Sequence, residues 1–240
     1  MKVSIIMPVW IRNKKLEDLS ISAINSLLEP KAEFIIIDNG SPELFEYGRS
    51  VSSIFIRNRE NLGYAKAVNQ GFRLASGDLI AVANNDIRVT LNWLEAAEAF
   101  AAQPIFKVGS LHYRMIGYGE KTVAGDQVWL SGKERWCSSS FFVIRRDAIP
   151  EGGFDENYGL GGGEDWDFWL RVRRAGWNTA YTNMAYYEHK DSSTLKTLPT
   201  REKDGKRAST YFREKWGASP EELFEKDFPG QLAQAWKPMP

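Results

Sequence analysis

Three clusters of acidic and amide side chains follow apolar or glycine-rich runs of this sequence. Such side chains supply the oxygen atoms that hard divalent cations prefer, and a cation held by them can bridge the oxygens of a phosphate group. Each cluster also has an ordinary structural explanation, because Asn and Asp are frequent in turns and carboxylates stabilise the first turn of a helix. The clusters are Asp38-Asn39, Asn84-Asn85-Asp86 and Glu164-Asp165.

The segments before the first two clusters have the composition of buried strands. Leu79 to Ala83 is a short apolar run, typical of a strand in a parallel sheet whose two faces are covered by helices. In open α/β sheets, ligands bind beyond the carboxyl ends of the strands. We therefore expect the polar clusters to meet at one edge of the sheet.

Apolar runs and helical spacing alternate along the first part of the chain. This alternation predicts a parallel sheet with right-handed crossovers. The predicted strands are Val3 to Met7, Phe34 to Ile37, Val51 to Ile56 and Leu79 to Ala83, and the predicted helices are Leu16 to Leu28, a short helix starting at Ser41-Pro42, and Gly63 to Ala75.

The pattern is looser in the second part, where short strands joined by Gly-rich turns predict an antiparallel extension of the sheet. A glycine-rich segment, Gly159 to Gly163, leads into a helix from Glu164 to about Ala175. The other predicted elements are a helix at Thr90 to Ala102, strands at Val108 to Tyr113, Val123 to Leu130, Ser138 to Ile144 and Thr179 to Thr182, a segment at Ala185 to Asp191, and tail helices at Arg201 to Trp216 and Pro220 to Lys226.

Composition narrows the class of protein. The 240 residues include 31 basic and 31 acidic side chains, so the overall charge does not indicate nucleic acid or an anionic membrane as the main partner. The single cysteine, Cys137, excludes an internal disulfide and a cysteine-rich zinc site, and it is typical of a reducing compartment. We find neither a signal-peptide pattern nor an apolar run long enough to span a bilayer, and we expect a cytoplasmic protein.

Five motifs, in matching order and spacing over about residues 3 to 190, resemble those of family 2 glycosyltransferases. The branch that looks most similar is the rhamnosyltransferase-like one. The motifs are Pro8-Val9, Ile37-Asp38-Asn39-Gly40-Ser41, the segment Arg57 to Gly71, Ser76-Gly77-Asp78 leading to Asn84-Asn85-Asp86, and Gly152-Gly153-Phe154-Asp155 followed by Gly163-Glu164-Asp165-Trp166-Asp167.

The resemblance implies an α/β structure with the GT-A fold: a Rossmann-like, mainly parallel sheet flanked by helices, with a small antiparallel extension on the acceptor side. It implies a GT-A domain at residues 1–195, with a nucleotide-sugar-binding half at 1–103 and an acceptor-side half at 104–195, and a C-terminal helical tail at 196–240. The implied reaction is metal-dependent, inverting transfer of a hexosyl or deoxyhexosyl group from a UDP-, dTDP- or GDP-linked sugar to an acceptor hydroxyl.

The same resemblance implies roles for residues around the donor. Asp86 and His189 would hold Mn²⁺ or Mg²⁺, although His189 also has a purely structural explanation. Asp38 would accept a hydrogen bond from a pyrimidine ring. The remaining residues of the implied nucleotide-sugar site are Pro8 and Val9, which would frame the base, Arg12 and Lys66, which are either phosphate partners or surface charges, and Asn61, Gly63, Asn84 and Asn85.

On the acceptor side, Asp165 matches the family's catalytic base, which takes the proton from the attacking hydroxyl. Glu164 is the second candidate for that base, and Trp166 is a candidate acceptor contact. The Gly159 to Gly163 loop either closes over the donor or serves as a linker. Asn84 stands where the metal motif commonly has an acidic residue, so we expect weaker metal binding.

Two other functions agree with parts of the sequence. A sugar-nucleotide nucleotidyltransferase shares the architecture, but it needs a Gly-rich loop after the first strand, and Pro8 to Arg12 contains no glycine. A non-catalytic carbohydrate-binding protein that retains the GT-A fold would fit Asn84. The acceptor stays open among lipid-linked sugar, polysaccharide, protein and modified nucleic acid.

Overall fold

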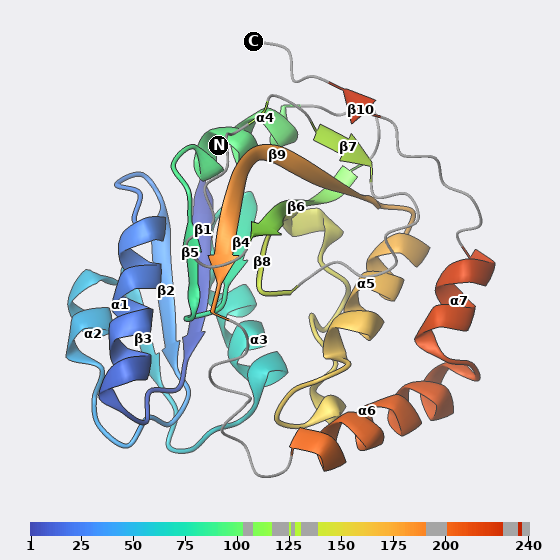
Figure 1. Ribbon diagram of the computed structural model, residues 1–240, viewed down its shortest axis with the longest axis horizontal. Coiled ribbons are helices and arrows are strands. Elements are labelled where there is room, and N and C mark those ends of the chain that lie inside the picture. Colours follow the sequence, from blue (N-terminus) through green and yellow to red (C-terminus); the bar gives the residue numbers. More distant parts are fainter. Residues whose placement is uncertain are drawn as a thin grey trace.

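The computed structural model describes residues 1–102, 108–116, 125, 128–130, 139–190, 201–227 and 235–236. One mixed sheet runs through the molecule, with strand order β10-β7-β9-β6-β8-β4-β1-β2-β3 and β5 paired with β9 (Figure 1). The strands are β1 Val3–Val9, β2 Glu33–Asp38, β3 Ile54–Arg57, β4 Leu79–Ala83, β5 Ile87–Val89, β6 Val108–Ile116, β7 Val128–Leu130, β8 Phe141–Arg145, β9 Asn178–His189 and β10 Ala235–Trp236.

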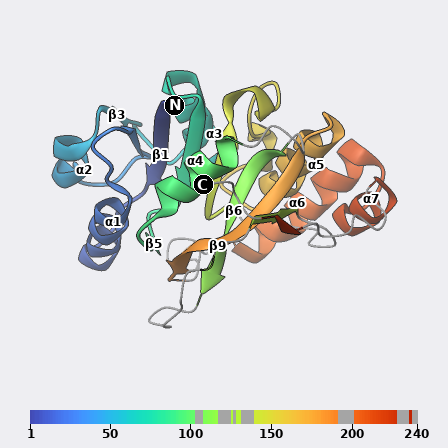
Figure 2. The same cartoon turned by 90° about the horizontal axis from the view of Figure 1, so that it is seen from above.

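Helices cover both faces of this sheet. Figure 2 shows α1 and α2 at one end of the molecule and α5, α6 and α7 together at the other. The helices are α1 Lys14–Leu27, α2 Glu46–Val51, α3 Tyr64–Leu74, α4 Trp93–Ala101, α5 Glu164–Arg174, α6 Arg201–Trp216 and α7 Pro220–Asp227, with single 3₁₀ turns η1 at Arg146–Ala148 and η2 at Glu156–Tyr158.

The first four strands in the chain form the predicted parallel core. β1 pairs in parallel with both β2 and β4, and β2 pairs in parallel with β3. Val9 lies opposite Asp38 in this register, so the carboxyl ends of β1 and β2 are level. The residues that follow β1, β2 and β4 therefore gather at one edge of the sheet, as the sequence predicts.

Alternation along β1 divides the core into two layers. Ile5 and Met7 belong to a cluster that includes Ile24 of α1 and Phe100 of α4. Ile6 faces the opposite way, into a cluster built with α3, α5 and α6. Because successive side chains of a strand point to opposite faces, one apolar strand serves both layers.

The antiparallel extension is confirmed. It contains one long strand where the sequence predicts two separate segments. β8 is antiparallel to its neighbours β4 and β6. β9 is a single twelve-residue strand that arcs over the molecule, pairing in parallel with β6 and antiparallel with β5 and β7 (Figure 1). The predicted segments at 179–182 and 185–191 are thus one strand up to His189.

Several predicted boundaries are wrong, among them the starts of three elements in the first half of the chain. The helix expected at Ser41-Pro42 begins at Glu46, because the Ser41 hydroxyl accepts the Ile11 N–H in a loop contact at 2.9 Å instead of capping a helix. The strand expected from Val51 begins at Ile54, since Val51 still belongs to α2. The helix expected from Thr90 begins at Trp93, after the short strand β5.

The tail helices pack on the main body. Ala208 and Phe212 of α6 and Leu223 of α7 are buried in the same cluster as Phe168 of α5. The predicted domain boundaries at 103/104 and 195/196, like Cys137, lie outside the described residues, so the division into domains stays a prediction. Within the described part of the chain, no helix combines the length and apolar character needed to cross a bilayer.

Candidate active site

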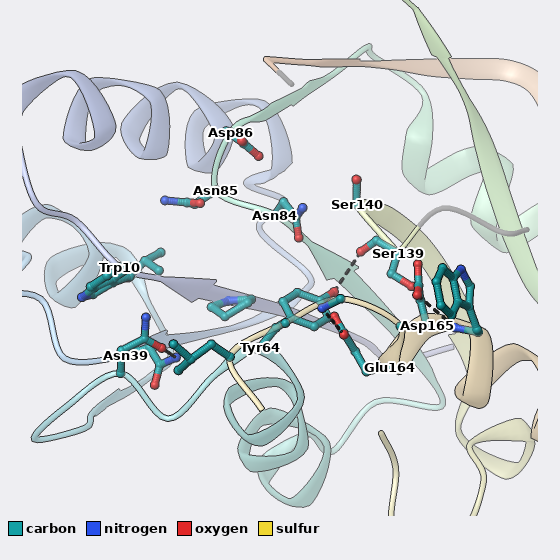
Figure 3. Close-up of a pocket in the computed structure, with 18 residues that line it drawn as sticks. Trp10, Asn39, Tyr64, Asn84, Asn85, Asp86, Ser139, Ser140, Glu164 and Asp165 are labelled. Carbon is teal, nitrogen blue, oxygen red and sulfur yellow. Dashed lines mark hydrogen bonds between the residues drawn. The ribbon is translucent and has the colours of Figure 1, made fainter. Parts of the chain in front are cut away.

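A pocket of about 420 Å³ opens at the carboxyl edge of the parallel strands. Figure 3 shows Trp10 and Asn39 toward one end of it and Glu164 and Asp165 toward the other. The described residues that line the pocket are Pro8, Val9, Trp10, Asn39, Asn61, Tyr64, Asn84, Asn85, Asp86, Ser139, Ser140, Leu160, Gly161, Gly162, Gly163, Glu164, Asp165 and Trp166.

The end of β4 brings an aspartate and a histidine together. Asp86 is 5% exposed, and one of its oxygens, Oδ1, lies 3.1 Å from Nε2 of His189. The two side chains meet because β5 pairs with β9, so that Ile87 stands opposite His189. His189 itself is outside the lining set, and it reaches the pocket through Asp86.

The neighbouring amides of this motif are held by the scaffold. Asn85 is 7% exposed and donates from its side chain to the Ser20 hydroxyl of α1 at 2.9 Å. The backbone N–H of Asn84 donates to the Ser140 carbonyl at 2.8 Å, which joins β4 to the residues before β8. These bonds give the loop after β4 a fixed course along the pocket.

The other carboxylates come from the first turn of α5. Glu164 is buried and accepts a short hydrogen bond from the Gly162 N–H. This bond joins the segment Gly159 to Gly163, here called the glycine loop, to the start of α5. Burial, together with the nearby charge of Asp165, raises the pKa of Glu164 to about 7. Burial also raises the pKa of Asp165 to about 6. Two adjacent carboxyl groups with raised pKa values thus share this turn, an arrangement that suits a proton acceptor in catalysis.

The glycine loop approaches the start of α3 closely. Gly63 has φ +90°, and a Cβ atom there would lie 2.2 Å from the carbonyl oxygen of Gly159. The Tyr64 N–H donates to the Leu160 carbonyl at 3.3 Å. Gly63 is not among the lining residues, so its position indicates a structural part in seating the loop.

A network of amides holds the loop that leads into α3. Asn39 accepts hydrogen bonds from the Asn58 side chain and the Leu62 N–H, and it donates to Asn61. Asn58 in turn exchanges hydrogen bonds with Gln70 of α3. Asn39 and Asn61 are therefore fixed where they line the pocket.

Asp38 is not among the residues that line the pocket. The residue is fully buried, accepts the Ser41 N–H at 3.0 Å and faces Arg57 at 3.5 Å. Within the described part of the chain, its Oδ2 atom has no hydrogen-bond partner. Its neighbour Asn39 lines the pocket instead, and the contact of Asp38 with a nucleobase stays a prediction.

Arg12 and Lys66 also lie outside the lining set. The Arg12 guanidinium stacks on the Trp10 ring, 4.2 Å from its centroid, and Lys66 is exposed on α3. Among the described lining residues there is no lysine or arginine, whereas Asp86, Glu164 and Asp165 bring three acidic groups. A phosphate in this pocket would meet carboxylates with no basic side chain of the described lining beside it.

The pocket includes four residues to which the sequence patterns assign no role in the site: Trp10, Tyr64, Ser139 and Ser140. Trp10 directly follows β1, and a position just after a parallel strand predicts a place at the ligand-binding edge of the sheet. Tyr64 donates its hydroxyl hydrogen to the Ser139 carbonyl at 2.8 Å. The serines arrive through the antiparallel pairing of β8 with β4, which local spacing does not reveal.

The side-chain atoms of Asp86 and His189 suit a divalent cation that has few protein ligands. A carboxylate oxygen and an imidazole nitrogen stand together at Asp86 and His189, and both atom types bind Mn²⁺. No group of three or more His, Cys, Asp or Glu residues able to hold a metal occurs in the described parts of the chain. A cation here would complete its coordination with ligand oxygens or water.

The fold and site agree with a known family. Residues 4–152 match the family model described as glycosyl transferase family 2, which covers more than half of the chain. An uncharacterised protein of Mycobacterium bovis is 31% identical over 206 residues, an alignment that covers 78% of this chain and 71% of that protein. The chain therefore belongs to glycosyl transferase family 2.

A relative that is named for its function matches over a shorter stretch. Dolichol-phosphate mannosyltransferase of Pyrococcus furiosus is 33% identical over 93 residues, which cover 37% of this chain and 26% of that protein. This chain thus aligns with only about a quarter of that relative's length.

Two solved structures share the fold. S. aureus TarS (residues 1–349) in complex with UDP superposes with a TM-score of 0.62 at 15% identity and covers 94% of this chain and 75% of that one. The mannosyltransferase PcManGT of Pyrobaculum calidifontis, in complex with GDP-Man and Mn²⁺, gives 0.65 at 15% identity, covering 94% and 68%. The predicted GT-A fold is confirmed.

Proposed function

We propose that this glycosyltransferase is metal-dependent and inverting, and that it moves a hexosyl or deoxyhexosyl group from a UDP-, dTDP- or GDP-linked sugar to an acceptor hydroxyl. One observation carries the proposal: a single pocket is lined by Asp165, a carboxylate with a raised pKa, and by Asp86, which is paired with His189. Within the family we place the chain in the rhamnosyltransferase-like branch, on the motifs between Pro8 and Asp167.

The donor nucleotide fits the end of the pocket at Trp10. An aromatic face beside the carboxyl end of β1 offers a stacking surface for a base, and Pro8 and Val9 frame it. Asn39 and Asn61 offer fixed amide groups for base or ribose. TarS was solved with UDP and PcManGT with GDP-Man, so similar folds hold either class of base, and the nucleotide is left to experiment.

Mn²⁺ or Mg²⁺ is the proposed cofactor, held by Asp86 and His189. When bound, such an ion neutralises the negative charge that develops on a departing diphosphate. The absence of lysine and arginine from the described lining residues supports this choice. Asn84 is a neutral ligand at best, so the affinity for the free ion is expected to be low and to rise when the nucleotide is present.

Asp165 is the proposed catalytic base. It takes the proton from the acceptor hydroxyl while that oxygen forms a bond to the anomeric carbon. The bond from this carbon to the diphosphate oxygen breaks on the opposite face, and its electron pair leaves with the nucleoside diphosphate. Attack opposite to departure inverts the anomeric configuration. Glu164, which shares the turn, is the alternative base.

Trp166 is the proposed acceptor contact, since it lines the pocket directly after Asp165 and sugars pack on aromatic faces. The single cysteine agrees with a reducing compartment, and we propose the cytoplasm. The acceptor remains a choice among lipid-linked sugar, polysaccharide, protein and modified nucleic acid.

The proposed reaction is tested by incubating the protein with UDP-, dTDP- and GDP-sugars and Mn²⁺, with and without carbohydrate acceptors, and measuring free nucleoside diphosphate. We expect release from one donor class, accelerated by an acceptor. Carbohydrate binding without release from any donor would contradict the proposal and favour the non-catalytic function that Asn84 suggests.

A further inference from the structure

The C-terminal helix α6 packs directly on the segment that carries the proposed base. Two aromatic side chains of α6 make edge-to-face contacts with it. The ring centroids of Tyr211 and Tyr158 lie 4.9 Å apart, and those of Phe212 and Trp166 lie 6.2 Å apart. Trp166 lines the pocket and follows Asp165. Phe212 of α6 therefore contacts the residue that directly follows the proposed base.

Lys215 of α6 joins two aspartates that flank this segment. Its Nζ lies 2.7 Å from Oδ2 of Asp155 and 2.6 Å from Oδ1 of Asp167. Asp167 is fully buried, and the Trp216 indole N–H donates to the same Oδ1 at 2.9 Å. The Tyr211 hydroxyl donates to Asp155 at 2.9 Å. Four contacts to two carboxylates thus come from consecutive turns of one helix.

These contacts lie on both sides of the glycine loop, Gly159 to Gly163. Asp155 caps η2, ahead of the glycines, and Asp167 stands in the first turn of α5, two residues beyond Asp165. Lys215 is therefore a bridge between the entry to the loop and its exit. Since the chain between them carries Glu164 and Asp165, fixing its two ends limits where those carboxylates can point.

Two glycines of the loop, Gly159 and Gly163, fit against α6 with little room. A Cβ atom at Gly159 would lie 2.8 Å from the Arg207 guanidinium, and one at Gly163 would lie 3.0 Å from Cβ of Ala208. Arg207 also donates to the Asn157 carbonyl at 2.9 Å. The tail helix thus forms the outer wall on which the loop rests.

The charge arrangement makes Lys215 hard to replace. Arg171 also pairs with Asp167, at 2.7 Å, but it approaches the other oxygen, Oδ2. Burial raises the pKa of Asp155, yet hydrogen bonds from Lys215, the Asn157 N–H and Tyr211 outweigh that effect and lower the pKa to about 2. Without Lys215, no cation would join Asp155 to Asp167, and the segment between these two aspartates would lose this link.

We propose that Lys215 is a positioning residue of this enzyme: by bridging Asp155 and Asp167 it makes α6 a structural part of the active site and holds Asp165 toward the donor. The structural half of this proposal concerns the loop alone, and the kinetic half rests on the proposed function. Lys215 is not among the lining residues of the pocket, so its effect passes through the loop.

The structural half is tested by amide hydrogen exchange on the protein without ligand. Lys215→Met should speed exchange in peptides covering residues 159–166 by about tenfold, while peptides from β1 and α3 stay unchanged. Lys226→Met, at an exposed position of α7, is the matched control and should change neither. Unchanged exchange in residues 159–166 of Lys215→Met would overturn the proposal. This outcome does not depend on any enzymatic activity.

The kinetic half is tested on the same variants. Lys215→Met should lower kcat for transfer by about tenfold or more, with the Kd for the nucleotide within about twofold, and Lys215→Arg should restore most of the rate. A proportional loss of rate and nucleotide binding, or no loss of rate, would overturn a positioning role. If Lys215→Met does not fold, Tyr211→Phe removes one bond to Asp155, keeps the ring, and should show the same split in smaller measure.

Discussion

Asp165 and Glu164 present two adjacent carboxyl groups to the pocket, and only one of them is needed as a base. Asp165→Asn keeps the shape and removes the proton acceptor, so we expect kcat to fall by about 10²–10⁴-fold with nucleotide affinity preserved. Glu164→Gln should lose less, because the amide oxygen that it introduces can still accept the Gly162 N–H. Near-normal turnover by Asp165→Asn would move the base to Glu164 or remove it from this pair.

The raised pKa values also predict a pH dependence. Transfer requires an ionised base, so kcat should rise with pH and level off above the apparent pKa values of the pair, near 6 to 7. The pH profile of kcat, measured at saturating donor, checks this. An acidic limb near the ordinary carboxyl pKa of about 4 would contradict the burial of the pair.

The same titration links the site to stability, with a definite sign. Asp165 binds its proton more tightly in the folded state than in the unfolded state, because its pKa is raised by folding. The protonated group therefore favours the folded state at low pH, and this contribution to the free energy of unfolding is lost as pH rises through about 6. At pH 8, Asp165→Asn should therefore raise the thermal midpoint by a few degrees, since about 1 kcal/mol corresponds to roughly 2–4 °C for a chain of this size. A lower midpoint would show that the ionised group stabilises the fold.

His189 has both a metal-binding and a structural explanation, and a metal titration separates them. Because its Nε2 stands 3.1 Å from Asp86, His189→Ala should raise the Mn²⁺ concentration needed for half-maximal nucleotide binding by about tenfold, without a matching fall in the thermal midpoint. An unchanged Mn²⁺ requirement would make His189 structural.

Among the elements, the glycine loop packs closely against the start of α3 as well as against α6. Gly63 has φ +90° and no space for a Cβ atom beside Gly159, so Gly63→Ala should destabilise the fold by at least about 1 kcal/mol and lower turnover. Gly205→Ala is the control, since no described atom outside the neighbouring turns of its own helix lies within 4 Å of that Cβ, and it should stabilise α6 by about 0.5–1 kcal/mol. Equal effects of the two substitutions would show that the loop does not rest on Gly63.

Elements whose pattern is local were predictable from the sequence, whereas those that depend on distant pairing were not. α3 and α5 follow from helical spacing, and β4 from its apolar run. The unity of β9 depends on its pairing with three other strands, which no local pattern reports. Ser41 shows the same limit, because its hydroxyl serves a contact thirty residues away along the chain.

Over the whole molecule, the parallel topology explains why so much of the site could be anticipated. Strand ends at one edge bring Pro8, Asn84 and Asp86 together, and the glycine loop adds Glu164 and Asp165. Topology does not specify which side chain of a pair faces the ligand. At the end of β2 the sequence favours Asp38, yet Asp38 is buried and faces the exposed Arg57, and its neighbour Asn39 lines the pocket.

The whole pocket, acidic and without lysine or arginine among its described lining residues, should bind a nucleoside diphosphate only with a cation. The direct test is calorimetric titration of metal-stripped protein with UDP, GDP and dTDP, each with and without Mn²⁺, on the unaltered chain and on Asp86→Ala. We predict tight binding of one nucleotide that requires Mn²⁺ and is lost in Asp86→Ala. Binding that is equally tight without Mn²⁺, or no binding of any of the three, would contradict a metal-dependent donor site.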